Sequence, residues 1–306
     1  MHLATSRPIL YGTPPTTLVS VAHNFMQCSP LILGSYQLAD LAPASVESAT
    51  LYAPASSIER RYVLARMLRA LAVGGNLTAL APKDKGGTRL AAELTAFGCM
   101  VVDTARHHHR IVTTTRPTIL HGLDDAIAAG DMQQHPRHGL WTQPGIFSWD
   151  TIDAGSALLR DHLPPLAGMG ADMGAGLGVL SLATLQSPTV TSLTLIAIYR
   201  RAIHAAKRNL TDPRAHFLWA DIRAAQNLPP NLDFVVMNPP FHDAGIEDKT
   251  LGHGFIRRAA SMLKPDGRCW LVANRHLPYE ALLAQCFSRN RMVVDAAGFK
   301  VFESVK

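Results

Sequence analysis

The 306-residue chain has only four cysteines and no apolar run that could cross a membrane. The cysteines, at positions 28, 99, 269 and 286, have the spacing of neither a metal site nor a disulfide framework, which indicates a reducing, cytoplasmic setting. The most apolar stretch, residues 176–199, is interrupted by Gln186, Ser187 and Pro188 and therefore predicts helix, turn and strand. The first residues are mixed and Pro-rich, which predicts no signal peptide. These features disfavour secreted and integral membrane proteins.

What the chain does contain is a high apolar content and an excess of positive charge. Its hydrophobic fraction of 47% predicts a large buried core and, at this length, two domains. The formal net charge of +6 and the isoelectric point near 9.3 favour a polyanionic partner.

The most informative short segment is Asn238-Pro239-Pro240-Phe241, which directly follows an apolar run, residues 234–237, that predicts a buried strand. The Asn238 side-chain oxygen and a proline carbonyl are two acceptors on a restricted backbone, and Phe241 adds a flat ring. Two acceptors that hold both N–H bonds of an exocyclic amine favour a pyramidal nitrogen, whose lone pair can face an electrophilic methyl group. The segment therefore indicates methylation of an amine on a base, with an ordinary Asn-Pro turn as the alternative.

A glycine-rich segment lies upstream of residues 238–241, which form the corner after the expected strand. Glycines at 174, 176 and 178 permit a tight strand-to-helix turn and a close approach of the backbone to a ligand. Their spacing is shorter than that of the dinucleotide-binding fingerprint. In a methyl donor the bound anion is a methionine carboxylate, and Asp172 could meet the amino group of the same ligand. A glycine-rich loop without a ligand is the alternative.

Strands and helices are expected to alternate in the C-terminal half. The expected strands are residues 192–199, 215–218, 234–237, 268–273, 291–295 and 299–305, and the expected helices are residues 200–210, 252–263 and 279–287. Repeated strand-helix units predict an α/β fold with a mainly parallel, doubly wound sheet that binds its ligand at the carboxyl ends of the strands. Both motifs fall at such ends.

Several separated segments resemble the ribosomal RNA guanine-N2 methyltransferases, in particular the 16S enzymes, with the 23S enzymes as near relatives. These segments are QPGIFS (143–148), DAGS (153–156), DMGAGLGVLS (172–181), NPPFH (238–242) and VANRHLPY (272–279). The resemblance is dense from about residue 140 to the end. It implies a class I methyltransferase fold and methyl transfer from S-adenosylmethionine to a guanine N2. We expect a cytoplasmic monomer that binds ribosomal RNA or a ribosomal subunit and no membrane.

The resemblance also assigns site residues. The cofactor would be bound by Asp172, Gly174 and Gly176 at its methionine end and by Asp221 beside its adenine. The guanine would be held by the catalytic residues Asn238, Pro239, Pro240 and Phe241, and Asn238 would also lie nearest the transferred methyl. Alternatively, Asp221 caps the segment that follows it.

One position departs from the family pattern. The strand after the glycine loop normally ends in an acid that binds the ribose hydroxyls, whereas here Ala197 stands at that point with no Asp or Glu nearby. Losing two charge-assisted hydrogen bonds would cost about 1.5–3 kcal/mol each. Either the cofactor binds weakly, another group such as the Tyr199 hydroxyl substitutes, or the site has decayed.

The chain also resembles itself. MVVD at 100–103 recurs at 292–295, an offset of 292 − 100 = 192, and several residues between 66 and 90 match at the same offset without a gap. We therefore expect two tandem doubly wound domains that arose by duplication: a degenerate copy at 1–130, a linker at 131–144 and a catalytic domain at 145–306. The counterpart of the Asn-Pro-Pro corner lies near Tyr52-Ala53-Pro54-Ala55, which lacks both the acceptor and the ring.

The first half would then bind RNA or stabilise the protein. Its basic residues could contact phosphates, with a solvated helix face as the alternative; they include Arg60, Arg61, Arg66, Arg69, Lys83, Lys85 and Arg89. His107-His108-His109 is not expected to bind a metal, because adjacent residues of a strand point to opposite faces and no acid or cysteine cluster is near.

Two other functions remain open at this point. A release-factor glutamine-N5 methyltransferase would use a similar corner, but Phe241 stands where a tyrosine is expected. A non-catalytic RNA-binding or ribosome-assembly factor would account for Ala197.

Overall fold

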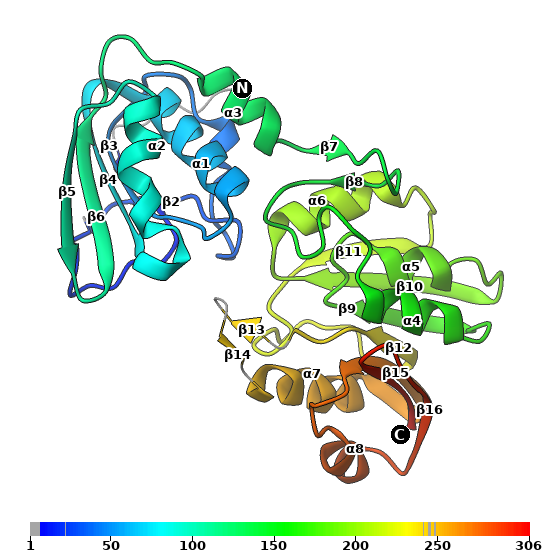
Figure 1. The fold of residues 1–306 in the computed structure, drawn as a ribbon. Helices are drawn as coiled ribbons and strands as arrows, with labels where there is room; N and C mark the ends of the chain where they lie inside the picture. Colours follow the sequence, from blue (N-terminus) through cyan, green and yellow to red (C-terminus); the bar gives the residue numbers. More distant parts are fainter. Residues whose placement is uncertain (1–6, 22, 241, 244–245, 248) are drawn as a thin grey trace. The chain divides into compact units, whose positions relative to one another are not determined.

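The computed structural model describes residues 7–21, 23–240, 242–243, 246–247 and 249–306. The chain forms two compact units (Figure 1). The N-terminal unit comprises Met1–Met132 and Gln143–Gly145, and the C-terminal unit comprises Gln133–Thr142 and Ile146–Lys306. Each unit is built around one large sheet.

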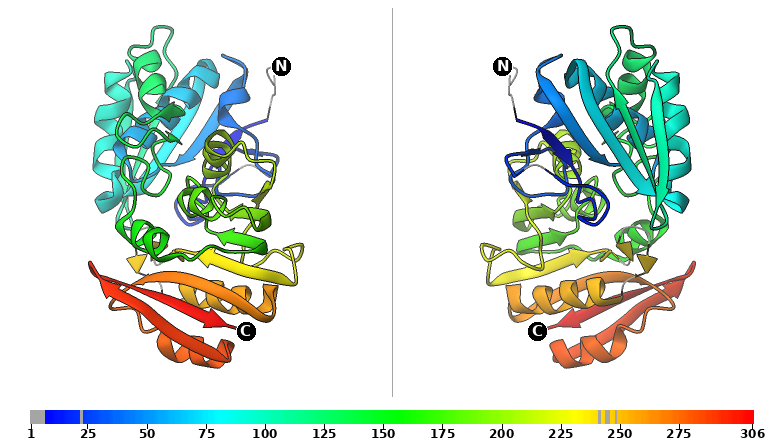
Figure 2. Two further views of the ribbon diagram at one scale, coloured as in Figure 1. Left: turned by 90° about the vertical axis from the view of Figure 1, so that its right-hand side faces the viewer. Right: turned by 90° about the vertical axis from the view of Figure 1, so that its left-hand side faces the viewer.

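The sheet of the C-terminal unit has seven strands in the order β11-β10-β9-β12-β15-β17-β16. The first five run parallel, whereas β17 is antiparallel to both β15 and β16. The strands are β9 (Gly168–Met173), β10 (Val190–Ala197), β11 (Ala215–Trp219), β12 (Leu232–Met237), β15 (Leu263–Asn274), β16 (Arg289–Ala296) and β17 (Phe299–Val305). Figure 2 follows this sheet from its green strands to its red ones. The expected α/β class with a mainly parallel, doubly wound sheet is confirmed, and the strand order reverses between β9 and β12.

Helices cover both faces of this sheet. They are α4 (Ala154–His162), α5 (Val179–Thr184), α6 (Arg200–Asn209), α7 (Lys249–Met262) and α8 (Glu280–Cys286). In β12, Phe234 and Val236 share one buried cluster with side chains of α4, α5 and α6, whereas Val235 and Met237 share another with α7 and α8. Both faces of β12 are therefore covered, which is why its sequence is a continuous apolar run and not an alternating one.

The expected elements differ from the observed ones mainly at their ends. The strand expected at 268–273 is part of the longer β15, which begins at Leu263. Leu263 pairs with Leu232 of β12 and Arg268 pairs with Phe234, so the register shifts between these two pairs. Gly267 lies in this irregular part, where a Cβ would be 2.9 Å from the carbonyl oxygens of Leu232 and Lys264. Residues 264–267, which lie between the expected helix and the expected strand, are thus part of β15.

The N-terminal unit has a six-stranded sheet in the order β2-β1-β3-β4-β6-β5. Strands β2, β1, β3 and β4 are parallel, and β6 is antiparallel to both β4 and β5. The strands are β1 (Ile9–Tyr11), β2 (Met26–Gln27), β3 (Val46–Tyr52), β4 (Leu71–Pro82), β5 (Val101–Arg106) and β6 (His109–Thr115), and the helices are α1 (Ser57–Ala70), α2 (Leu90–Ala96) and α3 (Leu123–Gly130). Short 3-10 turns occur at Leu38–Asp40, Lys83–Lys85 and Gly87–Arg89. One apolar cluster joins α1, α2 and the central strands.

Arg60 is not available to RNA, contrary to the expectation for the basic residues of this unit. Its side chain is only 1% exposed, and its guanidinium donates to the two Glu93 carboxylate oxygens at 2.7 and 2.8 Å. It also donates to the carbonyl oxygens of Pro54 and Ala55 at 3.3 and 2.8 Å. Arg60 is therefore a buried structural cation.

Other members of the basic set have intramolecular partners. Arg66 donates to Asp131 at 3.0 Å, Arg69 pairs with Asp124, and the Arg61 guanidinium lies 5.1 Å from the centre of the Phe97 ring. Lys83 and Arg89 are exposed, and Lys85 is half-buried.

The histidine segment is a turn, so the strand assumed for it is wrong. His107 and His108, with φ of 44° and 59°, form the two-residue connection of the β5–β6 hairpin, and His109 begins β6. Two consecutive left-handed residues match the right-handed twist of a tight hairpin. The His109 ring nitrogen Nδ1 lies 2.8 Å from the His107 carbonyl oxygen.

The remaining elements are short hairpins. The expected linker contains β7 (Gln133–Gln134) and β8 (Trp141–Thr142), and the backbone of Trp141 is held by the Asn209 side chain of α6 at 2.7 and 3.0 Å. A second hairpin, β13 (His242–Asp243) and β14 (Ile246–Glu247), follows β12. Within the described ranges, no helix is both long and apolar enough to cross a bilayer.

Candidate functional site

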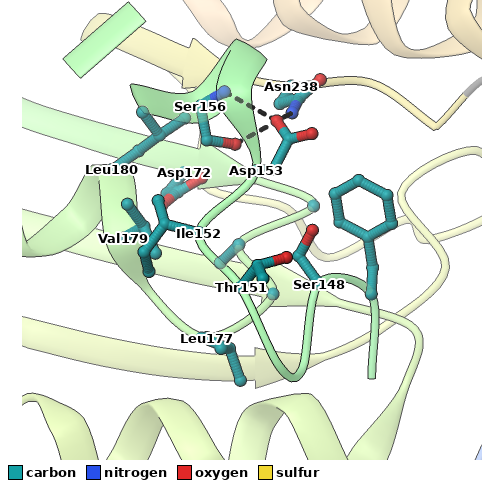
Figure 3. A pocket seen from close by; sticks show the side chains of 14 residues that line it. Ser148, Thr151, Ile152, Asp153, Ser156, Asp172, Leu177, Val179, Leu180 and Asn238 are labelled. Carbon is teal, nitrogen blue, oxygen red and sulfur yellow. Dashed lines mark hydrogen bonds between the residues drawn. The ribbon is translucent and has the colours of Figure 1, made fainter. Parts of the chain in front are cut away.

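A pocket in the C-terminal unit lies at the carboxyl ends of β9 and β12, where the strand order reverses (Figure 3). It is lined by the loop before α4, the start of α4, the glycine loop and the end of β12. The lining residues are Phe147, Ser148, Thr151, Ile152, Asp153, Ser156, Asp172, Gly174, Ala175, Gly176, Leu177, Val179, Leu180 and Asn238. The structure therefore brings the two sequence motifs together at the point where open α/β sheets bind ligands.

The glycine loop joins β9 to α5. Gly174, Gly176 and Gly178 have φ of 82°, 54° and 86°, a backbone conformation that side chains with a Cβ rarely adopt. A Cβ at Gly174 would lie 3.8 Å from the Asn238 carbonyl oxygen, which shows how closely the loop approaches the corner after β12. At Gly178 a Cβ would be 2.5 Å from the Leu210 side chain, so this glycine also permits the packing of the loop against the end of α6.

Asp172 is a buried carboxylate at the end of β9. It is 1% exposed and accepts a 2.7 Å hydrogen bond from the Ser181 hydroxyl. Burial raises the pKa of Asp172 to about 7, while hydrogen bonds from the Ser181 side chain and backbone oppose this rise. A cationic ligand group in the pocket would favour the ionised carboxylate, so the position suits an ammonium group.

Asn238 follows β12 directly and is held from α4. Its side-chain nitrogen donates to Asp153 Oδ2 at 2.8 Å and lies 2.9 Å from Ser156 Oγ (Figure 3). Asp153 is the N-cap of α4 and accepts from the Ser156 backbone N–H at 2.7 Å. Sequence reasoning used the segment 153–156 only for its resemblance and missed this contact, although Asp153-x-x-Ser156 has the pattern of a helix N-cap.

The rest of the corner is described in part. Pro239 is buried and Pro240 is exposed, and neither is among the residues that line the pocket. Phe241, expected to stack on the base, lies outside the described residues.

Asp221 is not among the residues that line this pocket. It follows β11, where Oδ1 accepts from the Arg223 backbone N–H at 2.9 Å and both carboxylate oxygens accept from the Arg223 guanidinium at 3.1 and 3.0 Å. These bonds hold the pKa of Asp221 below its usual value, although partial burial opposes them. The contacts are those of the capping alternative. They leave the assignment of Asp221 to the adenine as a proposal.

Ala197 ends β10 beside Trp219 of β11, and it is 6% exposed. Close to it, the Trp219 indole N–H donates to the Ile198 carbonyl oxygen at 2.7 Å, and Arg201 donates to the Tyr199 hydroxyl at 3.0 Å. The strand therefore ends where the family's ribose-binding acid is expected, but with a small apolar side chain.

Comparisons with known proteins agree with this geometry. The model of the methyltransferase small domain family matches residues 137–303, which is more than half of the chain. The chain is 30% identical to the ribosomal RNA small subunit methyltransferase C of Erwinia tasmaniensis, over 86% of this chain and 77% of the relative. It is 31% identical to the protein of the same name from Pseudomonas aeruginosa, over 84% of this chain and 78% of the relative.

The solved structure of the T. thermophilus 16S rRNA N2 methyltransferase in complex with AdoMet and guanosine matches over the whole chain, with a TM-score of 0.76. The match covers 100% of this chain and 90% of that chain, at 21% identity. At this identity the likeness supports a common fold.

Proposed function

This chain belongs to the methyltransferase small domain family, together with the proteins named ribosomal RNA small subunit methyltransferase C. From this membership we propose its activity. The protein transfers a methyl group from S-adenosylmethionine to the exocyclic N2 amine of a guanine in 16S ribosomal RNA. The observation that carries the proposal is the position of the Asn238 amide, which lines one pocket together with Asp172 and the glycine loop. A ribosomal RNA substrate would place the enzyme in the cytoplasm.

The pocket residues fit the methionine end of S-adenosylmethionine. Asp172 would hold the ammonium group, and Gly174 and Gly176 would let the backbone approach the ligand without a Cβ between them. Leu177 and Leu180 add apolar surface to the same pocket. When bound, the cofactor supplies an electrophilic methyl group on its sulfonium.

The corner would hold the guanine amine. We infer that Asn238 Oδ1 and a carbonyl of Pro239 or Pro240 accept the two N2 hydrogens, so that the nitrogen lone pair faces the methyl group. Phe241 would set the plane of the base, as the resemblance implies. Because the N2 amine is paired or stacked in structured RNA, the base must be exposed or flipped into the pocket. The excess proton leaves to water after an in-line displacement.

Ionisation of Asp172 gives the first testable prediction. The folded-state pKa of about 7 lies above the usual value of 3.8, so the folded chain binds this proton more tightly than the unfolded chain does. The stability that protonated Asp172 contributes is therefore fully present below the pKa of this carboxyl in the unfolded chain, and it is lost as pH rises from about 4 to 7. We expect Asp172→Asn to raise the free energy of unfolding relative to wild type above pH 7, seen in urea titrations at pH 5 and 8.

The same variant should weaken cofactor binding. In the wild type, the affinity for S-adenosylmethionine should rise by roughly tenfold between about pH 5.5 and pH 7, as the carboxylate ionises while the α-amino group of the ligand stays protonated. Asp172→Asn should bind more weakly at pH 8 and lose this pH dependence, measured by calorimetric titration. Equal affinities of the two proteins at pH 8 would exclude a contact between Asp172 and the ammonium group.

A substitution at Ala197 is expected to strengthen cofactor binding. Because the strand end has no carboxylate for the ribose hydroxyls, Ala197→Asp should tighten S-adenosylmethionine binding by about tenfold or more, the effect of one or two charge-assisted hydrogen bonds. Ala197→Asn is the uncharged control and should gain less. Unchanged affinity in Ala197→Asp, by calorimetry, would show that another group already binds the ribose.

We further propose that the N-terminal unit is a degenerate copy of the C-terminal unit. Matched in sequence order, its strands β1 to β6 follow the same spatial order as β9, β10, β12, β15, β16 and β17, with no partner for β11. Helix α1 and strand β4 correspond to α7 and β15 at offsets of 249 − 57 = 192 and 263 − 71 = 192. The offset is that of the sequence repeat.

Two glycines support this proposal in detail. A Cβ at Gly75 would lie 2.9 Å from the carbonyl oxygens of Ala72 and Glu47, the same pair of clashes that Gly267 would have in β15. From α2 and α8 onward, however, the offset falls to 280 − 90 = 190. The ungapped correspondence expected from the sequence is therefore wrong by two residues in this part of the chain.

The register supports a counterpart of Asn238 in this copy. Leu51 pairs with Ala79 as Met237 pairs with Leu271, so the next residue, Tyr52, would be that counterpart. Tyr52 has no side-chain amide, and its hydroxyl lies 3.4 Å from the His109 ring. We propose that this unit stabilises the enzyme and binds RNA through exposed cations such as Lys83 and Arg89.

Methyl transfer onto ribosomal subunits tests the proposed function directly. Subunits lacking the modification would be incubated with labelled S-adenosylmethionine, and the nucleoside product identified by mass spectrometry. N2-methylguanosine in the small-subunit RNA is the expected product. Label on a release factor offered in parallel would favour the glutamine alternative. Failure to bind the cofactor at millimolar concentration would favour a non-catalytic factor.

A further inference from the structure

We propose that Asp153 and Ser156 are positioning residues that fix the orientation of the Asn238 side-chain amide. In this orientation the Asn238 oxygen, and not its NH2 group, is left free to accept a hydrogen bond from the amine that is methylated. The proposal deepens the proposed function and rests on it, because it concerns how that site presents its acceptor.

The contacts set the orientation. The Asn238 NH2 group has two hydrogens, and it has two acceptors from α4, Asp153 Oδ2 at 2.8 Å and Ser156 Oγ at 2.9 Å. An ionised carboxylate can only accept a hydrogen bond. If the amide turned over, its oxygen would face the Asp153 carboxylate and two acceptors would oppose each other. The reversed amide is therefore excluded as long as Asp153 stays in place.

Asp153 is itself fixed by the start of α4. Its Oδ2 also accepts from the Ser156 backbone N–H at 2.7 Å, and a negative charge is favoured at a helix N-terminus. Gly155 leaves room for this arrangement, because a Cβ there would be 3.1 Å from Asp153 Oδ2 and 2.9 Å from the Phe299 ring. The Asp-x-Gly-Ser segment thus supports one oxygen that serves both the helix cap and the catalytic amide.

The chemistry depends on this orientation. A reversed amide would present N–H groups to the N–H bonds of the guanine amine, so the amine would not be gripped. A carboxylate that accepts from the Asn238 NH2 group also polarises the amide and makes its oxygen a stronger acceptor. Groups that orient metal ligands typically affect activity by about 10–100-fold, and we expect an effect of this size for the groups that orient Asn238.

Two substitutions at Asp153 separate positioning from capping. Serine and asparagine both cap helices about as well as aspartate. Asparagine keeps an acceptor at the distance of Asp153 Oδ2, whereas the shorter serine does not reach the Asn238 NH2 group. We expect Asp153→Ser to lower kcat by about 10–100-fold, and Asp153→Asn to retain most of the activity. The KM for the RNA and the Kd for S-adenosylmethionine should change little in both.

A matched control and a second variant complete the set. Asp161→Ser makes the same change on the same helix at an exposed residue whose ion-pair partner is Arg160, and it should leave kcat unchanged. Ser156→Ala removes the other acceptor and should lower kcat with Tm nearly unchanged. If Asp153→Ser and Asp153→Asn have the same kcat as wild type, Asp153 is only a helix cap and the proposal is overturned.

Amide NMR tests the orientation of Asn238 without catalytic turnover. Its result is therefore independent of the test of the proposed function. In side-chain amide NMR spectra of the full chain, the two Asn238 NH2 protons should exchange slowly with water in the wild type. They should exchange faster in Asp153→Ser, but not in Asp161→Ser. Fast exchange in the wild type would overturn the proposal even if the enzyme is active, and slow exchange would uphold the lock even if another amine were the substrate.

Discussion

Replacing Asn238 with alanine should lower methyl transfer by at least about 10²–10³-fold, the size of effect seen when a preorganised polar group is removed from an active site. The variant loses the acceptor that holds the guanine amine. The fold should persist, because Asn238 is only half-buried and the cap of α4 uses the Ser156 backbone N–H. Transfer of labelled methyl groups onto ribosomal subunits measures the loss.

Two controls make the Asn238 result specific. Asn227→Ala is the same chemical change at an exposed residue of the same unit and should leave transfer unchanged. Calorimetric titration of Asn238→Ala should still show S-adenosylmethionine binding, because Asp172 and the glycine loop are intact. Near-normal turnover in Asn238→Ala would remove the corner after β12 from the catalytic machinery and with it the assignment to amine methylation.

Replacing Arg60 with methionine should destabilise the protein by about 3–5 kcal/mol, the usual cost of breaking a buried ion pair by removing one partner. Glu93, whose side chain is 11% exposed, would be left as a buried charge without its cation. The carbonyl oxygens of Pro54 and Ala55 would lose their donor as well. Urea unfolding followed by far-UV circular dichroism measures the change in free energy.

The matched variants for Arg60 change Arg61 on the same helix and Glu93, the ion-pair partner of Arg60. Arg61→Met removes a cation that lies over the Phe97 ring and should cost no more than about 1 kcal/mol. Arg60→Met combined with Glu93→Leu should recover most of the lost stability, because an apolar pair replaces the ion pair. A cost below about 1 kcal/mol for Arg60→Met alone would mean that water reaches Glu93 and that the pair is not structurally important.

Local sequence was sufficient where the physical cause is local. Consecutive apolar residues in 234–237 predicted a buried strand, and β12 is buried, with both of its faces covered. Glycines at 174, 176 and 178 predicted a tight strand-to-helix turn, and all three have positive φ. The order of these elements along the chain was enough to predict a doubly wound sheet with both motifs at its carboxyl edge.

Sequence reasoning was wrong where a residue's role depends on distant partners. Arg60 was expected to be available to RNA, but its partner Glu93 is 33 residues away and the two meet only in the folded unit. His107 and His108 were expected in a strand, but the hairpin needs two left-handed residues at that point. The repeat was expected without a gap at an offset of 192, but α2 and α8 begin 280 − 90 = 190 residues apart.

For the corner at Asn238, the sequence determined which polar groups are present, and the tertiary structure decided the orientation of the Asn238 side-chain amide. An Asn-Pro-Pro segment after a buried strand specifies an amide and carbonyl acceptors on a stiff backbone, which is a local property. Which atom of the amide faces the pocket is set by Asp153 and Ser156, at separations of 85 and 82 residues. These contacts form only because α4 packs against the sheet beside β12. A side-chain amide is nearly symmetric in shape, so only the acceptors placed around it by the fold can distinguish its oxygen from its nitrogen.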